Sequence, residues 1–374
     1  MKICLTGLVA LLTLAVQAAE MTEEGAVREQ FRAKLAPGGD FYPDPQEGVF
    51  VAAGHGLNVV VSRDDGKTWA RVFYAGPCGD HGPWAVWDNV AYTEGVFAIA
   101  SGWGSVGTVI ASDDGQNWRH LAGTDRNPGK PGAKPYDMRN TMQLIGVNGC
   151  FIMPLEATPD FGKTWFRTSA YDFKNDQGER LKLNLQHPAL AAAVRDGGRR
   201  VIVVADAGPV IFSDDLGRTW QPLQVDMPSW AGSGAQGIIA KDGVFLILKG
   251  DGRNVLRSAD GGITWTSHEL GIERPEGRSF SLSVAGDEFW VAGRTSKASK
   301  DGITWRSLPA GTPSGRIAVS DRGTIICVSR SRNNILRSTD GQVWQEVYTF
   351  APEGSGGAQG LAGIGWGRVR KITP

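Results

Sequence analysis

Asp80 and His81 are adjacent in a glycine-flanked stretch, and two tryptophans, Trp84 and Trp87, follow them closely. An imidazole beside a carboxylate can move protons near neutral pH, and indole faces stack on sugar rings. Tyr136 is a further side chain that could serve as a base. We therefore predict Asp80, His81 and Tyr136 as catalytic residues, the alternative for His81 being an ordinary polar side chain on the surface.

Arginines recur at the starts of the predicted inner strands and in the turns beside them. A guanidinium group binds carboxylate or sulfate through two parallel hydrogen bonds, so these residues predict an anionic ligand such as a uronic or sulfated sugar. The alternative is that they bridge neighbouring sheets or are solvated. Trp103, between two glycines, could stack on a sugar or wedge between sheets. The predicted substrate-binding residues are Trp103, Arg139, Glu156, His187, Arg253, Arg278, Arg294 and Arg316.

A short motif repeats seven times along the chain and organises the rest of the sequence. Its full form is Ser62-Arg63-Asp64-Asp65-Gly66-Lys67-Thr68-Trp69. It recurs at 158–165, 213–220 and 258–265, and in a form one residue shorter at 112–118, 299–305 and 338–344. Successive terminal tryptophans lie 39 to 55 residues apart, a spacing that indicates a repeat architecture.

Each motif is interpreted as a turn stapled by its own side chains. The Asp and the Ser or Thr oxygens can accept hydrogen bonds from backbone N–H groups, and the Gly permits a positive φ. The Trp can pack between neighbouring sheets, with its indole N–H directed at a carbonyl. A turn explains every position without a ligand, so we predict no metal at these acidic segments. Zinc-binding and nucleotide-phosphate motifs are absent from the sequence, and no cofactor is predicted.

Four short apolar strands accompany each motif. A strand opened by Gly lies upstream, as in Gly48-Val49-Phe50-Val51, and a second strand such as 57–61 leads into the motif. The Trp begins another strand, and a weakly apolar run such as 316–320 precedes the Gly-opened strand. Four strands per about 45 residues, without helical periodicity, are typical of a propeller blade. The sequence therefore predicts an all-β fold, a seven-bladed β-propeller of four-stranded antiparallel blades.

The C-terminal stretch repeats the start of a blade without completing one. Gly357-Ala358-Gln359-Gly360-Leu361 echoes Gly234-Ala235-Gln236-Gly237-Ile238. We expect residues 356–372 to pair with the N-terminal blade and close the ring, because this removes an exposed sheet edge. The propeller then spans residues 39–374, after a lead-in at 20–38 that could form a short helix.

Residues 1–19 are interpreted as a secretory signal peptide, with Lys2 followed by an apolar stretch from Ile3 to Val16. The protein is predicted to be secreted or periplasmic, without membrane insertion. The 374 residues include 39 basic and 39 acidic side chains, so bulk charge does not favour a nucleic-acid partner. Cys78, Cys150 and Cys327 remain after the leader, too few for a disulfide framework, and the last two lie in apolar runs.

The pattern Ser-x-Asp-x-Gly-x-Thr-Trp resembles the Asp-box of the sialidase-like, or BNR-repeat, β-propellers, and the resemblance covers essentially the whole chain after the leader. That superfamily includes exo-sialidases, xyloglucan-acting glycosidases, a photosystem II assembly factor and sortilin-type receptors. The resemblance implies that the boxes lie at the periphery, away from the ligand. Met138-Arg139-Asn140 stands where sialidases have Arg-Ile-Pro, and the late Tyr348 follows the seventh box on an outer strand. The sialidase reaction itself is therefore not predicted.

Together these features predict a secreted carbohydrate-active propeller, a monomer that acts on an acidic glycan as a glycoside hydrolase or polysaccharide lyase. Two alternatives remain open: a non-catalytic propeller that binds glycan or protein, and a periplasmic assembly factor. Sequence spacing does not give the carboxylate separations that define a glycosidase, so catalysis itself stays open. In each case we expect the ligand on the face that carries the connections into the inner strands.

Overall fold

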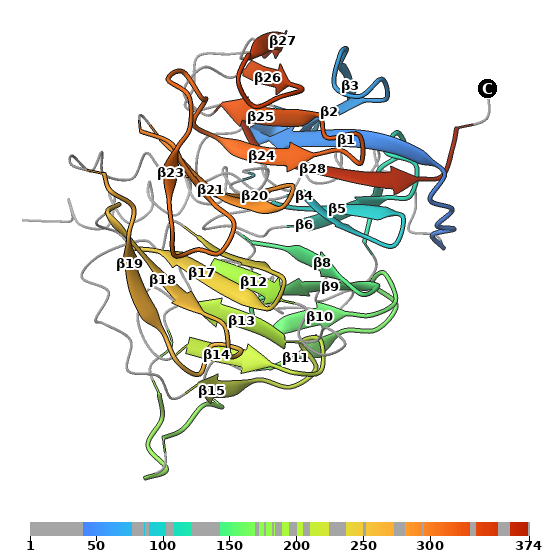
Figure 1. The fold of residues 1–374 in the computed structure, drawn as a ribbon. Coiled ribbons are helices and arrows are strands. Elements are labelled where there is room, and N and C mark those ends of the chain that lie inside the picture. The colour runs from blue at the N-terminus through green and yellow to red at the C-terminus, as the bar shows by residue number, and fades with distance from the viewer. Residues whose placement is uncertain are drawn as a thin grey trace, which may run out of the picture.

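The seven repeats fold into seven four-stranded antiparallel sheets, the blades, which follow one another around a ring (Figure 1). The structure is a computed structural model that describes residues 40–76, 86, 90–101, 108–121, 143–168, 172–175, 177–181, 183, 189–193, 200–204, 210–223, 237–249, 252–272, 281–293, 295–329, 334–350 and 360–372. The predicted fold, a seven-bladed β-propeller, is confirmed. The predicted leader and lead-in helix lie outside the described residues.

From the channel outward, the strands of each blade follow chain order, except that β28 takes the inner place in blade 1. Blades 1 to 3 comprise β28 (Leu361–Val369), β1 (Glu47–Gly54), β2 (Asn58–Ser62) and β3 (Ala70–Phe73); β4 (Val90–Thr93), β5 (Val96–Ser101), β6 (Thr108–Ser112) and β7 (Arg119–His120); and β8 (Ile145–Val147), β9 (Cys150–Met153), β10 (Glu156–Thr158) and β11 (Phe166–Arg167). Blades 4 and 5 comprise β12 (Ala189–Ala193), β13 (Arg200–Val204), β14 (Val210–Ser213) and β15 (Gln221–Leu223); and β16 (Ile238–Lys241), β17 (Val244–Leu248), β18 (Asn254–Ser258) and β19 (Thr266–Glu269). Blades 6 and 7 comprise β20 (Ser281–Ala285), β21 (Glu288–Ala292), β22 (Lys297–Ser299) and β23 (Arg306–Ser307); and β24 (Arg316–Val319), β25 (Ile325–Ser329), β26 (Asn334–Ser338) and β27 (Gln345–Thr349).

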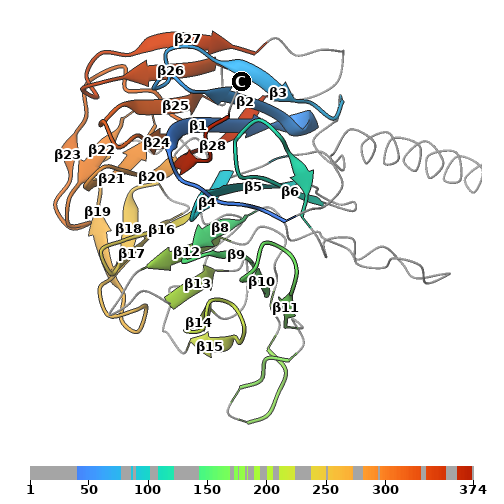
Figure 2. The same ribbon diagram turned by 90° about the vertical axis from the view of Figure 1, so that its right-hand side faces the viewer.

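The ring is closed by a strand from the far end of the chain. β28 pairs antiparallel with β1 along its length, from Gly54 opposite Leu361 to Glu47 opposite Val369. Figure 2 shows the two strands side by side, although they come from opposite ends of the sequence. β28 also contacts β24 of blade 7 and β4 of blade 2, so the inner strands form a continuous ring. The predicted pairing of the C-terminal stretch with the N-terminal blade is confirmed.

The hydrophobic core lies between the blades. Seven clusters of apolar side chains occupy the seven seams between neighbouring sheets. The tryptophan of each repeat packs into the seam with the preceding blade. Trp118 of blade 2, for example, shares a cluster with Val59 of blade 1, and Trp69 of blade 1 packs against the cluster of Ile326 in blade 7. The predicted packing of the tryptophans between sheets is confirmed.

The repeat turns, which are the seven segments that carry the motif, are held by their own side chains. In all seven, the Ser or Thr hydroxyl donates to the Asp carboxylate at 2.7–3.1 Å and accepts from the Gly N–H at 2.6–2.9 Å. The indole N–H donates to the Gly carbonyl in four turns, those of Trp69, Trp118, Trp165 and Trp265. The Ser or Thr, the Asp and the Gly of the motif therefore have a structural role in every turn.

The two ends of the blades carry different connections. In blade 1, β1 ends at Gly54, the 3₁₀ turn η1 (His55–Leu57) follows, and β2 then runs from Asn58 to the repeat turn at Ser62. We call the end with the repeat turns the turn face. The opposite end, the loop face, carries the connections between the second and third strands and those that lead to the next inner strand. The fold thus separates the stapled turns from the face where we expect the ligand.

Candidate functional site

Three of the predicted site residues are described, and all three lie at the loop face. Glu156 begins β10, Arg253 immediately precedes β18, and Arg316 begins the inner strand β24. The predicted residues that lie outside the described part of the chain are Asp80, His81, Trp103, Tyr136, Arg139, His187, Arg278 and Arg294. The sequence therefore placed the three described residues at one end of the blades, and the roles assigned to all of them stay predictions.

Arg316 reaches from blade 7 across the mouth of the channel. Its Nη1 atom lies 4.0 Å from the position that a Cβ would occupy on Gly237, just before the inner strand of blade 5. Because β20 of blade 6 lies between β16 and β24 in the ring, a side chain that joins them spans the loop-face opening. Ser281 of β20 anchors the adjacent Gly315, since its hydroxyl donates to the Gly315 carbonyl at 2.5 Å. The backbone just before Arg316 is thus tied to blade 6, while its guanidinium group lies beside the residue that precedes the inner strand of blade 5.

A tight basic turn of blade 5 lies at the same face. The N–H of Gly252 donates to the Lys249 carbonyl at 2.9 Å, and the Lys249 N–H donates to the Asn254 carbonyl at 3.0 Å. Arg253 extends from this turn and is exposed, while its carbonyl accepts the N–H of Leu270 at 2.7 Å. The backbone of this turn is therefore fixed, and Arg253 is exposed at the loop face.

Glu156 is placed differently from the other two. Its side chain is buried, and its Oε1 lies 3.8 Å from Nε of Arg167, its partner across the β10–β11 ladder. A cation so close satisfies part of the charge of a buried carboxylate. The contact gives Glu156 a structural role within blade 3. The cross-strand pair could not be predicted from sequence, because it depends on the register of a two-residue strand.

His55 is a loop-face residue that the predicted site does not include. It is 5% exposed and lies in η1, where its N–H donates to the carbonyl of Gly360 just before β28 at 3.1 Å. The Gly56 carbonyl accepts the N–H of Ala75, so the turn is tied to both sides of blade 1. The sequence could have indicated His55 as a site residue, because it lies between two glycines directly after a strand that begins with Gly.

Arginines bridge neighbouring blades at the turn face. Each of four donates from one blade to a backbone carbonyl in the repeat turn of the next blade around the ring. The pairs are Arg63 with Asp114, Arg200 with Gly261 (3.0 Å), Arg257 with Asp301 (2.7 Å) and Arg337 with Asp65 (2.9 Å). These four inter-blade arginines are not among the predicted site arginines, for which the inter-blade alternative stays a prediction. A shared Leu-Arg directly before the Ser of the fifth and seventh repeats was a sequence signal for two of them, Arg257 and Arg337.

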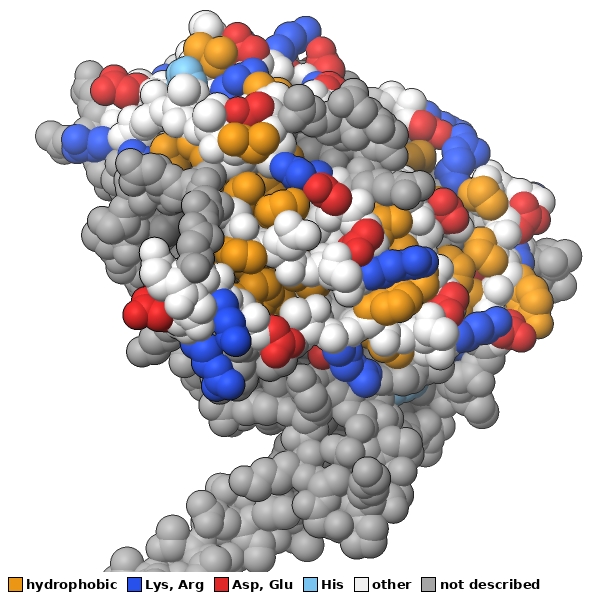
Figure 3. Space-filling view, turned by 90° about the horizontal axis from the view of Figure 1, so that it is seen from below, with side chains coloured by type: hydrophobic (Ala, Val, Ile, Leu, Met, Phe, Trp, Pro, Cys, Tyr) orange, Lys and Arg blue, Asp and Glu red, His pale blue; other side chains and the backbone are white. Residues whose placement is uncertain are grey.

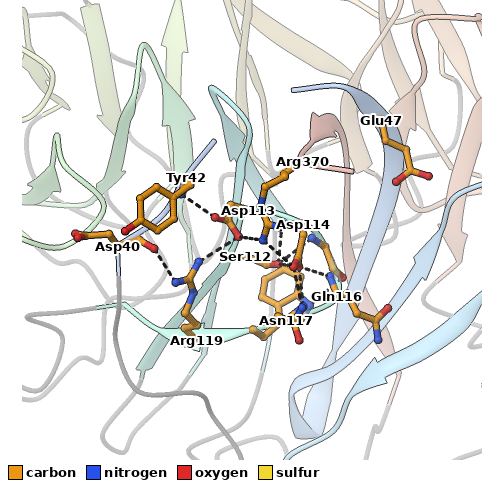
Figure 4. A network of polar contacts seen from close by, with 12 residues as sticks. Asp40, Tyr42, Glu47, Ser112, Asp113, Asp114, Gln116, Asn117, Arg119 and Arg370 are labelled. Carbon is orange, nitrogen blue, oxygen red and sulfur yellow. Dashed lines mark hydrogen bonds and ion pairs between the residues drawn. The ribbon is translucent and has the colours of Figure 1, made fainter. Parts of the chain in front are cut away.

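The repeat turn of blade 2 also binds both the segment before β1 and the residue after β28 (Figure 4). Asp113 accepts the N–H of Tyr42 at 2.8 Å and lies 3.1 Å from a guanidinium nitrogen of Arg119. Arg370 approaches Asp113 at 3.4 Å and Asp114 at 3.2 Å. Both carboxylates are buried, so this network holds the closing strand and the incoming segment together. The turn face of blade 2 is therefore occupied by structural contacts.

The two described cysteines are buried thiols that form no disulfide, Cys150 in β9 and Cys327 in β25. Burial raises the pKa of both, that of Cys327 to about 12, so neither is a nucleophile near neutral pH. Within the described ranges, no three His, Cys, Asp or Glu side chains are grouped to hold a metal ion. Nor, in that part of the chain, is any helix long and apolar enough to cross a membrane.

Charged side chains of both signs are interspersed on the molecular face seen in Figure 3, with hydrophobic side chains between them. Several basic side chains of the described chain form ion pairs, such as Arg200 with Asp214 and Arg306 with Glu288. On this face, the mixed charges do not form an extended positive surface.

No protein-family model matches this sequence, and no curated protein matches it. Solved structures do resemble the fold. A candidate 6-phosphogluconolactonase from Bacteroides uniformis has a TM-score of 0.50 and 8% identity, covering 86% of this chain and 99% of its own. A streptogramin B lyase (TM-score 0.48, 12% identity, 71% and 83% covered) and a nidogen/laminin complex (0.47, 10%, 86% and 98%) also match. At such identities the first likeness supports the propeller fold alone.

Proposed function

We propose that this protein is a secreted carbohydrate-active propeller that takes an acidic glycan on its loop face, over the mouth of the channel. The observation that carries the proposal is the position of Arg316, which extends from blade 7 to the inner strand of blade 5. A guanidinium group offers a planar fork of donors that matches a carboxylate or a sulfate. Its anchored backbone reduces the ordering that binding requires.

Two further features support a ligand on this side. Arg253 is exposed on a rigid turn of blade 5, and Lys249 is half-buried in the same turn. An acidic glycan that binds Arg316 and extends toward blade 5 would therefore approach two more positive charges. The turn face, in contrast, is committed to staples and inter-blade bridges. The repeats resemble the Asp-box, and this resemblance implies that the repeat turns lie away from the ligand.

The chemical step in this proposal belongs to Asp80, His81 and Tyr136. In a lyase, one of these side chains removes the proton next to the uronate carboxylate, while Arg316 neutralises that carboxylate and so makes the proton more acidic. In a hydrolase, the acid and base act at the glycosidic bond. The two reactions differ in their products, since elimination leaves an unsaturated sugar that absorbs ultraviolet light.

Binding to a panel of polyuronate, sulfated and neutral oligosaccharides tests the proposal. Arg316→Ala should weaken binding of the acidic ligand by roughly 10- to 100-fold, as expected for loss of a charge-assisted hydrogen bond. Arg306→Ala, which removes an arginine paired with Glu288 on an outer strand, is the matched control and should bind normally. Equal binding of neutral and acidic oligosaccharides, or normal binding by Arg316→Ala, would refute the proposed site.

Product analysis separates catalysis from binding. Reducing ends without ultraviolet absorbance identify a hydrolase, and absorbing products identify a lyase. His81→Ala and Tyr136→Phe should lose turnover while they keep most of the affinity, because Arg316 and its neighbours are unchanged. A ligand that binds through Arg316 but is never cleaved would assign the protein to the non-catalytic alternative.

A further inference from the structure

Lys297 is a buried lysine in the seam between blades 5 and 6. It begins β22, the third strand of blade 6, and is 9% exposed. Its Nζ donates to the Ser307 hydroxyl at 3.1 Å, and among the described residues it forms no ion pair. An ammonium group that is largely withdrawn from water normally has an anionic partner, so this lysine calls for an explanation.

The other blades show that packing of the seam does not require a cation at this position. Lys297 stands two residues before the Ser of its repeat turn, and in blade 3 the same position is Glu156, which lies opposite the cation of Arg167. In the remaining five blades the position is apolar, occupied by Val60, Ile110, Ile211, Leu256 and Leu336. The residue opposite Lys297 is Ser307, which carries no charge. Neither packing nor charge pairing within blade 6 therefore accounts for this lysine.

The ammonium group of Lys297 reaches the outer end of blade 5 at the loop face. Its Nζ lies 3.7 Å from the position that a Cβ would occupy on Gly271, which follows β19 and is exposed. Leu270, just before this glycine, packs into the seam between blades 5 and 6. Because successive side chains of a strand alternate, Glu269 extends from the opposite face of the sheet. The acid of this outer strand thus points away from Lys297.

The loop-face end of blade 5 has a cation at each extremity. At its inner extremity, Gly237 lies beside Nη1 of Arg316, and at its outer extremity, Gly271 lies beside Nζ of Lys297. Between them, β16, β17, β18 and β19 are hydrogen-bonded neighbours in that order. Three interstrand spacings separate the two extremities, a distance of about 14 Å. A single sugar residue is too short to contact both cations.

We propose that Lys297 binds a second acidic group of the glycan whose first acidic group binds Arg316. This inference rests on the proposed function and specifies its ligand, a polyanionic chain with acidic groups on separate sugar residues. The chain lies along the loop-face end of blade 5, from the mouth of the channel to the rim of the seam with blade 6. Its carboxylate or sulfate gives the ammonium group an anionic partner.

Two small residues flank the ammonium group and suit such a ligand. Ser307 of blade 6 and Gly271 of blade 5 are both exposed. Gly271 has a φ of 64°, a conformation that favours glycine, and it places no side chain over Nζ. The Ser307 hydroxyl, which accepts from Nζ, can donate its own proton to the ligand anion. The anion is then held by the ammonium group and the hydroxyl together.

Calorimetric binding of acidic glycans of different length tests the second site. The probes are galacturonate and hexagalacturonate, with the disaccharide and hexasaccharide of chondroitin sulfate as a second series. In the series that binds, Lys297→Met should weaken binding of the hexasaccharide by roughly 10-fold, as expected for loss of a charge-assisted hydrogen bond, and leave that of the short ligand unchanged. Met is an unbranched apolar side chain at a position that is apolar in five blades, so the thermal unfolding midpoint should not fall.

Lys300→Met is the matched control. It removes the same charge from the repeat turn of the same blade, where Lys300 pairs with Asp287, and should bind the hexasaccharide as the wild-type protein does. Wild-type affinity of Lys297→Met for the hexasaccharide would overturn the second site. An equal loss for the short and the long ligand would contradict the arrangement along blade 5.

Arg316→Ala separates this inference from the proposed function. It should weaken binding of the short ligand and of the hexasaccharide, whereas Lys297→Met should affect the hexasaccharide alone. If Arg316→Ala has this effect and Lys297→Met has none, the second site is refuted and the mouth site stands. If no acidic ligand binds, or if Arg316→Ala binds all of them normally, the proposed function is refuted and this inference with it.

Discussion

Asp260 is the residue in which the chemistry of the repeat turn is clearest. Burial alone would raise its pKa, but hydrogen bonds from the Thr264 hydroxyl and N–H, from Ser258 and from the Ile263 N–H outweigh it and lower the pKa to about 2. The pKa is also lowered for Asp64, Asp114, Asp160, Asp215, Asp301 and Asp340. All seven turns therefore favour the ionised carboxylate.

These shifts predict a loss of stability in acid. Since the folded pKa lies below the unfolded value, the contribution is present above about pH 4 and is lost as the pH falls through the folded pKa. For Asp260 that window runs from 3.8 down to about 2. Urea unfolding between pH 6 and pH 2.5 should show the free energy of unfolding falling steeply below pH 4. Asp260→Ala should unfold more easily at pH 6 by about 1 kcal/mol and show a shallower fall.

Asp113 is the acid on which the terminal network depends most. Asp113→Ala removes the partner of Arg119, Arg370 and the Tyr42 N–H, and should lower the free energy of unfolding by about 2–4 kcal/mol. Urea denaturation measures this loss. Asp287→Ala is the control, because its pair with Lys300 is exposed and should contribute little to the free energy of unfolding. Equal effects of the two substitutions would contradict the network.

For individual residues, the sequence predicted the place of a residue in its blade better than the residues that its side chain contacts. Arg316 could be placed at the loop face because it opens a strand whose order in the blade follows from the repeat. The pairing of Glu156 with Arg167 depends on cross-strand register, which local sequence does not fix. The contacts of the inter-blade arginines could not be predicted either, because they depend on which repeat turn lies beside which strand in the folded ring.

The element on which the ring depends is β28. Its alternating glycines allow β4 of blade 2 to approach, since a Cβ on Gly367 would clash with the Tyr92 ring and one on Gly365 would lie 2.8 Å from the Val90 carbonyl. The Tyr92 hydroxyl donates to the Arg368 carbonyl at 2.6 Å across the same contact. The Gly-rich composition of the last strand is thus a requirement of close packing between inner strands.

Gly367→Ala should therefore destabilise the closed ring. Forcing a methyl group into the Tyr92 contact should reduce the free energy of unfolding by about 1–3 kcal/mol, as measured by urea denaturation. Lys371→Ala, an exposed position beyond the strand, should leave stability unchanged. If the two variants were equally stable, β28 would not pack against blade 2 as described.

The strands could be predicted because the same motif, with the same flanking apolar runs, occurs seven times in the sequence. Each tryptophan marks the start of an outer strand, and the echo of Gly234-Ala235-Gln236 near the end of the chain predicted the closing strand. The long connections at the loop face carry no such repetition. The predicted catalytic residues, among them His81, lie in those connections, so the repeat does not position them.

At the scale of the whole molecule, the two ends of the blades carry different structures. The turn face holds the ring together through stapled turns, inter-blade arginines and the network of Asp113. The loop face carries Arg316, and we propose that it binds the ligand. Superfolds of this kind support many activities, so the ligand follows from the side chains at the mouth and not from the fold.

Hydrogen exchange in the presence of an acidic oligosaccharide tests this division most directly. Ligand at saturation should slow exchange in loop-face segments around Gly237, Lys249–Asn254 and Gly315–Ile317, and Arg316→Ala should remove the effect. Repeat turns such as 258–265 should exchange at the same rate with and without ligand. Protection concentrated in the repeat turns, with the loop face unchanged, would contradict the account.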